Sequence, residues 1–448
     1  MANIAASLQR IKDNPLEVLD RELIERVCRE CNHPWRIREL DPAATIAWFM
    51  QQIVRGNITC GEVGHLAGNR FSAQAYCEAR ARLPLSVYQA LLYEVHQRVM
   101  PQTHRQEHLW HGHRTFHIDG STFSMPDTKE LREAFGVPSG PAEGCAFPVA
   151  HLLVLFSAAT GLLIDVWASP LRTGDVAQTP EAHLHLDEGD IMIGDDSFSG
   201  YTHLAMLQKQ GLHGVFPVHH LRIVDFKKGR PHCSEANATP GMPRSRWIKS
   251  LGKEDQLVEY FKPAQKPAWI SDAEFKSLPE SITVRELRRT VQRPGLGKIT
   301  ITLVTTLLDP GAYPAADLLE LRLRRWDVET NIGHLKTTMK MDVLHCKSHE
   351  GVRKELIVFS IVYNLVRVVM LHAARRQKVP VSRISFADAY KWMRHAKPGD
   401  TLPVLMVNPY RPDRIEPRCK KRRPKQFDLM NKPREELRKL LKNKRKRA

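Results

Sequence analysis

The feature that most constrains the fold is a change of hydrophobic period near residue 115. The segments FHIDGSTF, VAHLLVLF and LLIDVWAS have the short apolar pattern of strands, and the turn AATG joins the last two into a hairpin. Helical stretches at about 180–186 and 201–210 then alternate with the strands DIMIGD and GVFPVH. Antiparallel strands followed by alternating helices and strands predict an α/β fold, with a mixed sheet covered by helices.

Before this change of period, residues 41–100 predict a run of short helices. The third, at about 72–82, carries Arg80 and Arg82 after a short turn, which suits a helix-turn-helix-like reader of DNA. A plain helical bundle without DNA contact is the alternative. The residues expected to cap these helices are Asp41, Thr59, Ser72 and Ser86, with Glu62 completing a capping box.

Further along the chain, Pro, Gly and charge clusters interrupt the rhythm between residues 219 and 297, with the strand-like pieces DQLVEYF and SITVRELRRTVQ between them. The strand KITITLVTTLL then resumes the core, and long helical segments follow. We therefore predict five segments: a helical N-terminal domain that binds DNA ends (1–105), the first half of a catalytic core (106–218), a β-rich insertion (219–297), the second half of the core with C-terminal helices (298–405), and a basic tail (406–448).

The net charge of the chain and its distribution indicate what kind of partner the protein binds. The 448 residues carry a formal net charge of +18, and residues 411–448 hold 17 Lys or Arg against 5 Asp or Glu, which is +12 of that total. A cationic tail of this density has the phosphate backbone of nucleic acid as its natural partner, although a merely solubilising tail would look the same.

Other features of the sequence predict the compartment of the protein and the redox state of its cysteines. The apolar runs fall short of the roughly 18 to 20 residues that cross a bilayer, so no membrane span is expected. The segment MANIAASLQRIKDN lacks the apolar stretch of a secretory signal, which favours the cytosol. Eight cysteines are expected to be free thiols there. Cys28 and Cys31, with His33 nearby, lack a second ligand pair at zinc-binding spacing, since Cys60 and Cys77 lie far apart in sequence.

Two carboxylates end apolar strands. Asp119 follows FHI and Asp195 follows IMIG. Because the carboxyl ends of neighbouring core strands open into one crevice, these two residues are candidates for a site, although a strand-ending Asp is also a common turn former.

A third carboxylate lies on the helical stretch after Pro314. With about 3.6 residues per turn, Glu329 shares an arc of about 60° with Arg322, Arg325, Lys336 and Lys340. Two strand aspartates and one helical glutamate would form an all-oxygen site for a pair of Mg²⁺ ions, with Mn²⁺ as a substitute. The four cations would hold DNA phosphates, unless Arg325 and Glu329 merely pair across a solvated face.

These motifs, taken together, resemble the DDE transposases of bacterial insertion sequences, specifically the insertion-sequence-four family. The resemblance runs from about residue 35 to 406. It rests on HIDGSTFSMPDT around the first Asp, GDIMIGDDSFSGY around the second and LLELRLRRWDVETNIGHLKTTM around the Glu. The last segment matches the family signature Tyr-x-x-Arg-x-x-x-Glu-x-x-x-x-x-x-Lys at Arg325, Glu329 and Lys336.

The resemblance implies a ribonuclease H-like core with a β-strand insertion, and Asp119, Asp195 and Glu329 as the metal-binding catalytic triad. It also implies phosphate contacts from Arg325 and Lys336, nicking at the ends of the element, and attack of the freed 3′-hydroxyl on target DNA. The partners would be the terminal inverted repeats and target DNA, bound by a homodimer in a bacterial cytoplasm, at the nucleoid. Related enzymes flip a base onto an aromatic side chain, for which Trp247 and Trp269 are candidates, although each is also an ordinary core or surface tryptophan.

One departure from the signature leaves alternatives open. Arg322 occupies the signature's Tyr position, and it can bind phosphate but cannot stack or hydrogen-bond as a phenol does. Asp196 competes with Asp195 as a ligand, although strand alternation sends its side chain the other way. Besides an active transposase, the sequence allows a metal-dependent nuclease without strand transfer, or a catalytically impaired DNA-binding remnant.

Overall fold

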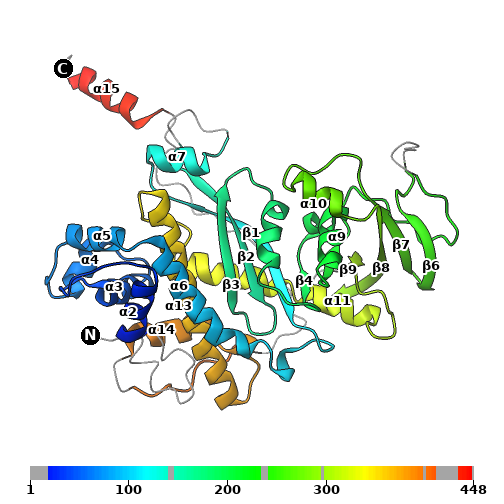
Figure 1. The fold of residues 1–448 in the computed structure, drawn as a ribbon, viewed down its shortest axis with the longest axis horizontal. Coiled ribbons are helices and arrows are strands. Elements are labelled where there is room, and N and C mark those ends of the chain that lie inside the picture. The colour runs from blue at the N-terminus through cyan, green and yellow to red at the C-terminus, as the bar shows by residue number, and fades with distance from the viewer. Residues whose placement is uncertain are drawn as a thin grey trace.

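The computed structural model describes residues 19–139, 146–233, 241–293, 297–396, 400–409 and 432–445, and all structural statements concern these residues. The N-terminal helices lie at one end of the molecule, a sheet crosses its middle, and the strands of the insertion extend to the other end (Figure 1). Most of the basic tail, including CKKRRPK, lies outside the described residues.

Nine strands form one mixed sheet in the order β3-β2-β1-β4-β5-β9-β8-β7-β6. Strand β2 runs antiparallel to its neighbours β1 and β3, whereas β1, β4 and β5 run parallel to one another. This order and these directions over the first five strands are those of a ribonuclease H-like core, so the predicted fold class is confirmed. The strands are β1 (Thr115–Ser124), β2 (Val149–Ser157), β3 (Leu163–Pro170), β4 (Ile191–Ile193), β5 (His213–Pro217), β6 (Arg246–Gly252), β7 (Asp255–Phe261), β8 (Ser281–Arg293) and β9 (Gly297–Thr305).

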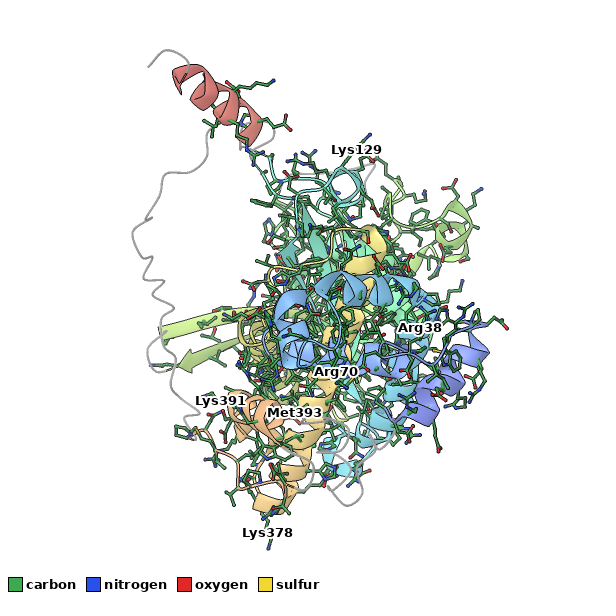
Figure 2. All side chains as sticks on the ribbon, turned by 90° about the vertical axis from the view of Figure 1, so that its left-hand side faces the viewer. Arg38, Arg70, Lys129, Lys378, Lys391 and Met393 are labelled. Atoms are coloured by element: carbon green, nitrogen blue, oxygen red, sulfur yellow. The ribbon has the colours of Figure 1, made fainter. Side chains whose placement is uncertain are left out.

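Helices cover both faces of this sheet. In chain order, the helices before β8 are α2 (Arg21–Glu30), α3 (Pro42–Val54), α4 (Cys60–Leu66), α5 (Ala73–Arg82), α6 (Leu85–Val99), α7 (Lys129–Phe135), α8 (Thr179–His183), α9 (Tyr201–Lys209) and α10 (Asp272–Ser277). The helices after β9 are α11 (Ala315–Leu323), α12 (Trp326–Gly333), α13 (His349–Gln377), α14 (Phe386–His395) and α15 (Arg434–Arg445). Helix α15 projects from the body of the molecule (Figures 1 and 2).

Alternation along β1 explains how the two faces are built. Phe116 and Ile118 point to one face, where they share an apolar cluster with α9. Phe123 points to the opposite face and packs into the cluster that contains α13. Residues on the face of Phe123 include Asp119, because side chains two apart along a strand share a face.

The N-terminal helices begin at the predicted caps with one exception. The side chains of Asp41, Thr59 and Ser72 each accept a hydrogen bond from a backbone N–H in the first turn that follows. The prediction for Ser86 is wrong, because α6 begins two residues earlier than this cap requires, after Pro84. Pro84 fixes φ at this entry, and no side chain caps the first turn of α6.

The N-terminal helices share part of their apolar core with the rest of the molecule. Buried residues of α2, α3 and α6 belong to the same apolar cluster as α13 and strands β1 and β2. The boundary at residues 105 and 106 remains a prediction of organisation, and the apolar core crosses it. Figure 2 shows exposed cations on this side of the molecule, among them Arg38 and Arg70, and others on the C-terminal helices, such as Lys391.

Helix α13 is the central support of this core. It has 29 residues and is long and apolar enough to cross a membrane, yet 89% of its most apolar window is buried inside the molecule. It packs against α3, α6, α14 and β3. Burial of this extent is what a core helix requires, and it explains the unbroken apolar run.

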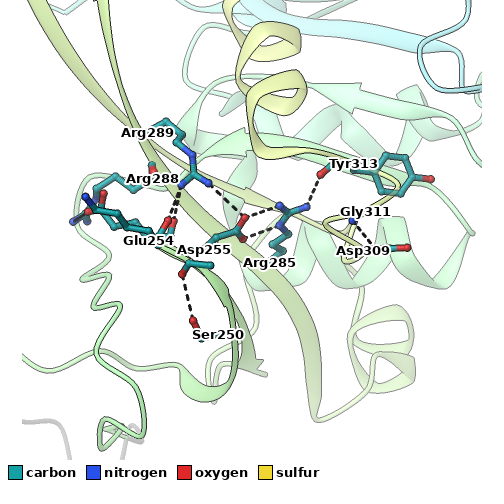
Figure 3. Close-up of polar contacts among 11 residues, drawn as sticks. Ser250, Glu254, Asp255, Arg285, Arg288, Arg289, Asp309, Gly311 and Tyr313 are labelled. Atoms are coloured by element: carbon teal, nitrogen blue, oxygen red, sulfur yellow. Dashed lines mark hydrogen bonds and ion pairs between the residues drawn. The ribbon is translucent and has the colours of Figure 1, made fainter.

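The β-rich insertion continues the core sheet, because β9 pairs with β5 on one side and with β8 on the other. A buried ion pair fixes its base: Arg285 of β8 donates from Nε and Nη2 to the Asp255 carboxylate, at 2.8 and 2.6 Å (Figure 3). Its Nη1 donates to the carbonyl oxygen of Tyr313, at 2.7 Å. Since Tyr313 leads into α11, the same guanidinium joins the insertion to the helices that follow.

Candidate active site

Strands β1 and β4 bring the two predicted aspartates to corresponding positions. The two strands are parallel neighbours, with His117 opposite Ile193, and each aspartate lies two residues further along its own chain. Asp119 is still within β1, whereas Asp195 has left β4 and caps a short 3₁₀ helix (Asp196–Ser199). Its carboxylate accepts hydrogen bonds from the backbone N–H and the hydroxyl of Ser197, at 2.9 and 2.5 Å.

The helix that carries the glutamate is not continuous, contrary to the prediction. Helix α11 ends at Leu323 and α12 begins at Trp326, so Arg324 and Arg325 form a turn between them. The five charged residues therefore do not lie on one continuous helix, although Arg325 and Glu329 still pair across one turn. Arg325, at the start of α12, also reaches β1.

Arg325 joins two of the three predicted acids. Its Nη1 donates to Oδ2 of Asp119 at 2.8 Å, and its Nη2 lies 3.5 Å from Oε1 of Glu329. The three side chains are mostly buried, with exposed fractions of 14% for Arg325, 15% for Asp119 and 30% for Glu329. A cation thus already lies between carboxylates from a strand and a helix that are about 200 residues apart in sequence.

Burial sets the electrostatics of Asp119. Loss of solvent raises the pKa of its carboxyl group to about 6, against the lowering effect of Arg325. The negative charge of Asp195 raises this pKa further, which is consistent with two carboxylates in one crevice. Asp119 is therefore negatively charged at neutral pH, and any additional positive charge nearby would stabilise this charged form.

Arg322 faces both aspartates from the last turn of α11. Burial, followed by repulsion from Arg325, lowers the pKa of its guanidinium to about 10, and the charges of Asp195 and Asp119 oppose this shift. Its Nε has no hydrogen-bond partner among the described residues. A buried donor without a partner, close to carboxylates, is suited to an incoming anionic oxygen.

The two predicted lysines have different positions. Lys336 lies on a π-helical turn (His334–Thr338), and its Nζ donates to the hydroxyl of Ser121 at 3.0 Å, two residues beyond Asp119 on the same face of β1. Lys340 has left the helix with a left-handed φ of 71°. Its stem lies against Gly56, near the start of α4, so the prediction of one helix face shared with Glu329 is wrong for Lys340.

A fourth acid near the site was missed from the sequence. Asp175 pairs with His151 of β2 and covers β1 so closely that a Cβ added at Gly120 would collide with its carboxylate. Its charge also raises the pKa of Asp119. Asp175 lies on a short 3₁₀ helix after a turn, and this setting has no motif that could have singled it out.

A cleft of about 650 Å³ opens beside the turn that follows the second aspartate. This cleft distinguishes between the two candidate tryptophans. Trp269 lines this cleft together with Ser197, and three cations contribute to its wall: Arg222, Arg244 and Lys262. Trp247 lies on β6, and its indole Nε1 is buried without a hydrogen-bond partner among the described residues. Of this pair, only Trp269 is among the residues that line the cleft.

Comparison with known proteins identifies the family. A family model described as a transposase DDE domain matches residues 110–365, more than half of the chain. The transposase InsG for insertion sequence element IS4 from Escherichia coli (strain K12) is 24% identical over 385 residues, which cover 80% of this chain and 79% of InsG. The chain belongs to the DDE transposases of the IS4 family.

Two further similarities are more distant. InsZ of the same E. coli strain is 22% identical over 283 residues, covering 62% of this chain and 89% of InsZ. The cryo-EM structure of a piggyBac transposase synaptic complex with hairpin DNA aligns with 84% of this chain and 77% of that chain, with 9% identity and a TM-score of 0.42.

Membership of the DDE transposases confirms the predicted enzyme class, a DNA transposase, and with it a DNA-binding protein. DDE transposases generally use divalent metal ions. The donors here fit such ions, because the carboxylates of Asp119, Asp195 and Glu329 are the hard oxygen ligands that Mg²⁺ prefers. The competing ligand Asp196 has its carboxylate 3.3 Å from Nδ1 of His220.

Proposed function

We propose that this transposase cleaves DNA at the ends of its own insertion element and joins the freed 3′ ends to target DNA, in a cut-and-paste reaction. The observation that carries the proposal is the bridging of Asp119 and Glu329 by Arg325, with Asp195 close enough to Asp119 to raise its pKa. Phosphoryl transfer needs acids that hold metal ions and cations that hold phosphate, and this arrangement offers both.

The three acids are the proposed metal ligands, with Mg²⁺ as the ion, two per site, and Mn²⁺ as its substitute. When bound, such ions supply Lewis-acid stabilisation of the attacking and leaving oxygens of DNA. A competing positive charge weakens the hold of Asp119 on Arg325. The guanidinium is then available to a DNA phosphate, beside the unpartnered Nε of Arg322.

Lys336 is the proposed phosphate contact next to the cleaved strand. Its ammonium group is half-buried, which lowers its pKa, and the Ser121 hydroxyl holds it on the Asp119 face of β1. Lys340 is proposed to touch the backbone further away, near the N-terminal helices. In this proposal the scissile phosphate lies between β1 and α12, within reach of all three acids.

The cleft with Trp269 is the proposed receptor for an unstacked base near the cleaved end. An aromatic face stacks on any base, and Arg222, Arg244 and Lys262 can hold the adjoining phosphates. This assigns the base-stacking role to Trp269 and leaves Trp247 as a structural side chain.

The proposed partners are the terminal inverted repeats, bound through the N-terminal domain (1–105) and the basic tail (406–448), and target DNA. Joining two ends in one complex calls for a homodimer on DNA. The proposed setting is the bacterial cytoplasm, with the protein associated with the nucleoid.

An excision assay in cells tests this proposal, with a marker flanked by the DNA that borders the gene. The wild type should excise the marker and Glu329→Gln should not, because the amide cannot replace a charged metal ligand. Glu320→Gln is the matched control, since Glu320 is exposed on α11 and pairs only at the surface with Arg324. Expression of every variant is checked by immunoblot.

Two other functions are separate outcomes of the same assay. Cleaved ends without joined products would favour a nuclease that lacks strand transfer. A silent wild type beside an active Arg322→Tyr variant would favour an impaired remnant, because the family signature has Tyr at that position. If all variants bind DNA but none excises, the protein is a DNA-binding remnant and the proposed reaction is wrong.

A further inference from the structure

A second group of side chains with metal-ligating atoms lies beside the proposed active site. Asp196, His219 and His220 each offer a ligand atom, and these atoms lie within 4.8 Å of one another. Asp196 begins the short 3₁₀ helix after β4, whereas the two histidines follow β5. Since β4 and β5 are parallel neighbours, their carboxyl ends bring the three residues to the same edge of the sheet.

The backbone holds these ligands in place. The hydroxyl of Ser199 donates to the carbonyl oxygen of Asp196 at 2.7 Å and accepts a hydrogen bond from the backbone N–H of His219 at 3.1 Å. One buried side chain therefore ties the turn that carries the carboxylate to the segment that carries both imidazoles. The imidazole rings of His219 and His220 lie side by side, with centroids 4.3 Å apart.

The separation of the ligand atoms suits a tetrahedral ion. Two ligands at about 2.0–2.1 Å from a zinc ion, with a tetrahedral angle between them, lie about 3.3 Å apart. The distance from Asp196 Oδ2 to His220 Nδ1 is 3.3 Å, which is long for a charge-assisted hydrogen bond. The carboxylate and the imidazole are thus spaced as two ligands of one ion.

We propose that Asp196, His219 and His220 bind a transition metal ion of the zinc class, separate from the three acids that bind Mg²⁺. Imidazole ligands favour Zn²⁺, Co²⁺ or Ni²⁺, whereas sites made of carboxylates alone favour Mg²⁺ and Mn²⁺. Three protein ligands leave a fourth tetrahedral position for water or an anionic oxygen. The position of this site, one residue from Asp195, makes a DNA phosphate oxygen the natural fourth ligand.

Metal binding to the full-length protein tests this assignment without any measurement of transposition. Purified chain is dialysed against Zn²⁺ and, separately, Co²⁺ in the presence of excess Mg²⁺, and bound metal is counted per chain. The wild type should keep one transition metal ion, with the visible absorption of tetrahedral Co²⁺. His220→Ala and His219→Ala should each lose that ion or bind it at least tenfold more weakly.

Controls separate this site from two others. Glu329→Gln should keep the ion, because that residue belongs to the proposed Mg²⁺ site. Cys31→Ser should also keep it, and a thiolate charge-transfer band that disappears in Cys31→Ser would instead place the ion at Cys28 and Cys31. The His220 side chain is 71% exposed, so its removal leaves the fold intact, which a melting curve checks. Equal stoichiometry in the wild type and both histidine variants would overturn the proposal.

Discussion

Arg325 donates to Asp119 across 206 positions of sequence and reaches Glu329 from the same guanidinium. This single side chain is held by a strand residue and a helix residue that the proposed chemistry needs together. Arg325 makes this contact from the turn between α11 and α12.

The burial of Asp119 predicts that Asp119→Asn stabilises the metal-free protein at neutral pH. The pKa of this carboxyl group is about 6 in the folded state against 3.8 as its ordinary value. Between these values the folded state binds the proton more tightly, so the free energy of unfolding falls as pH rises and the full penalty is present above pH 6. The amide removes this penalty, which is at most about 3 kcal/mol.

Urea unfolding at pH 7.5 and pH 4.5 in a chelating buffer measures this effect. The gain in Asp119→Asn should shrink toward the lower pH, where the wild-type carboxyl group binds its proton. Asp272→Asn is the control, because this carboxylate is 78% exposed on α10. A loss of stability in Asp119→Asn at both pH values would contradict the prediction.

Lys336→Met should reduce the salt dependence of DNA binding. One lost phosphate contact lowers the slope of log K against log salt by about 0.9 in magnitude. Fluorescence anisotropy with a duplex from the end of the element, at several salt concentrations, measures the slope. Lys129→Met serves as the comparison, because this exposed lysine lies on α7 (Figure 2). Identical slopes for the wild type and Lys336→Met would remove Lys336 from the phosphate contacts.

Trp269→Ala should abolish the stacking of a base in the cleft beside Asp195. A duplex with 2-aminopurine near the cleaved end should lose fluorescence when it binds the wild type, because stacking on an indole quenches the probe. Trp247→Ala should quench as the wild type does, since Trp247 lies on β6 outside the cleft. The reverse pattern, with quenching lost only in Trp247→Ala, would transfer the role to Trp247.

Gly120→Ala should damage both stability and cleavage. The added methyl group would collide with the carboxylate of Asp175, so either this side chain gives up its pairing with His151 or β1 shifts, at a cost of about 1–3 kcal/mol. Gly333→Ala is the matched control, because a Cβ there meets nothing within 4 Å and alanine favours the helical conformation. The melting temperature and the cleavage rate should therefore both fall in Gly120→Ala. Neither should fall in Gly333→Ala.

Cys60 and Cys77 should form a disulfide under oxidation. Their sulfur atoms lie 3.1 Å apart, on α4 and α5, and must approach by about 1 Å to bond. Diamide, as the oxidant, accepts the two hydrogen atoms that the thiols lose. Peptide mapping without reductant should give a crosslinked pair of peptides in the wild type and none in Cys77→Ser. Persistence of both free thiols after such treatment would show that α4 and α5 hold them apart.

Sequence reasoning succeeded where local chemistry decides the outcome. Helices α3, α4 and α5 begin after Asp41, Thr59 and Ser72, as these cap residues predict, and Asp119 lies on the first strand of the sheet. Strand period, cap residues and the three acidic motifs are all short-range signals. They were sufficient for the fold class and for the family.

Features that depend on contacts between distant segments could not be predicted in this way. Asp175 approaches Gly120 only because the sheet brings a loop over β1, and Cys60 meets Cys77 only because α4 packs on α5. The ion pair between Arg325 and Asp119 also joins distant segments, and local sequence could not have predicted it.

The continuous sheet has a mechanical consequence. Strand β9 is hydrogen-bonded to β8 of the insertion on one side and to β5 of the core on the other, and β5 pairs with β4, which leads to Asp195. A displacement of the insertion by bound DNA would therefore be transmitted to the turn of Asp195 through ladders of backbone hydrogen bonds. The position of a proposed catalytic acid is thus coupled to strands that lie far from it in the sheet.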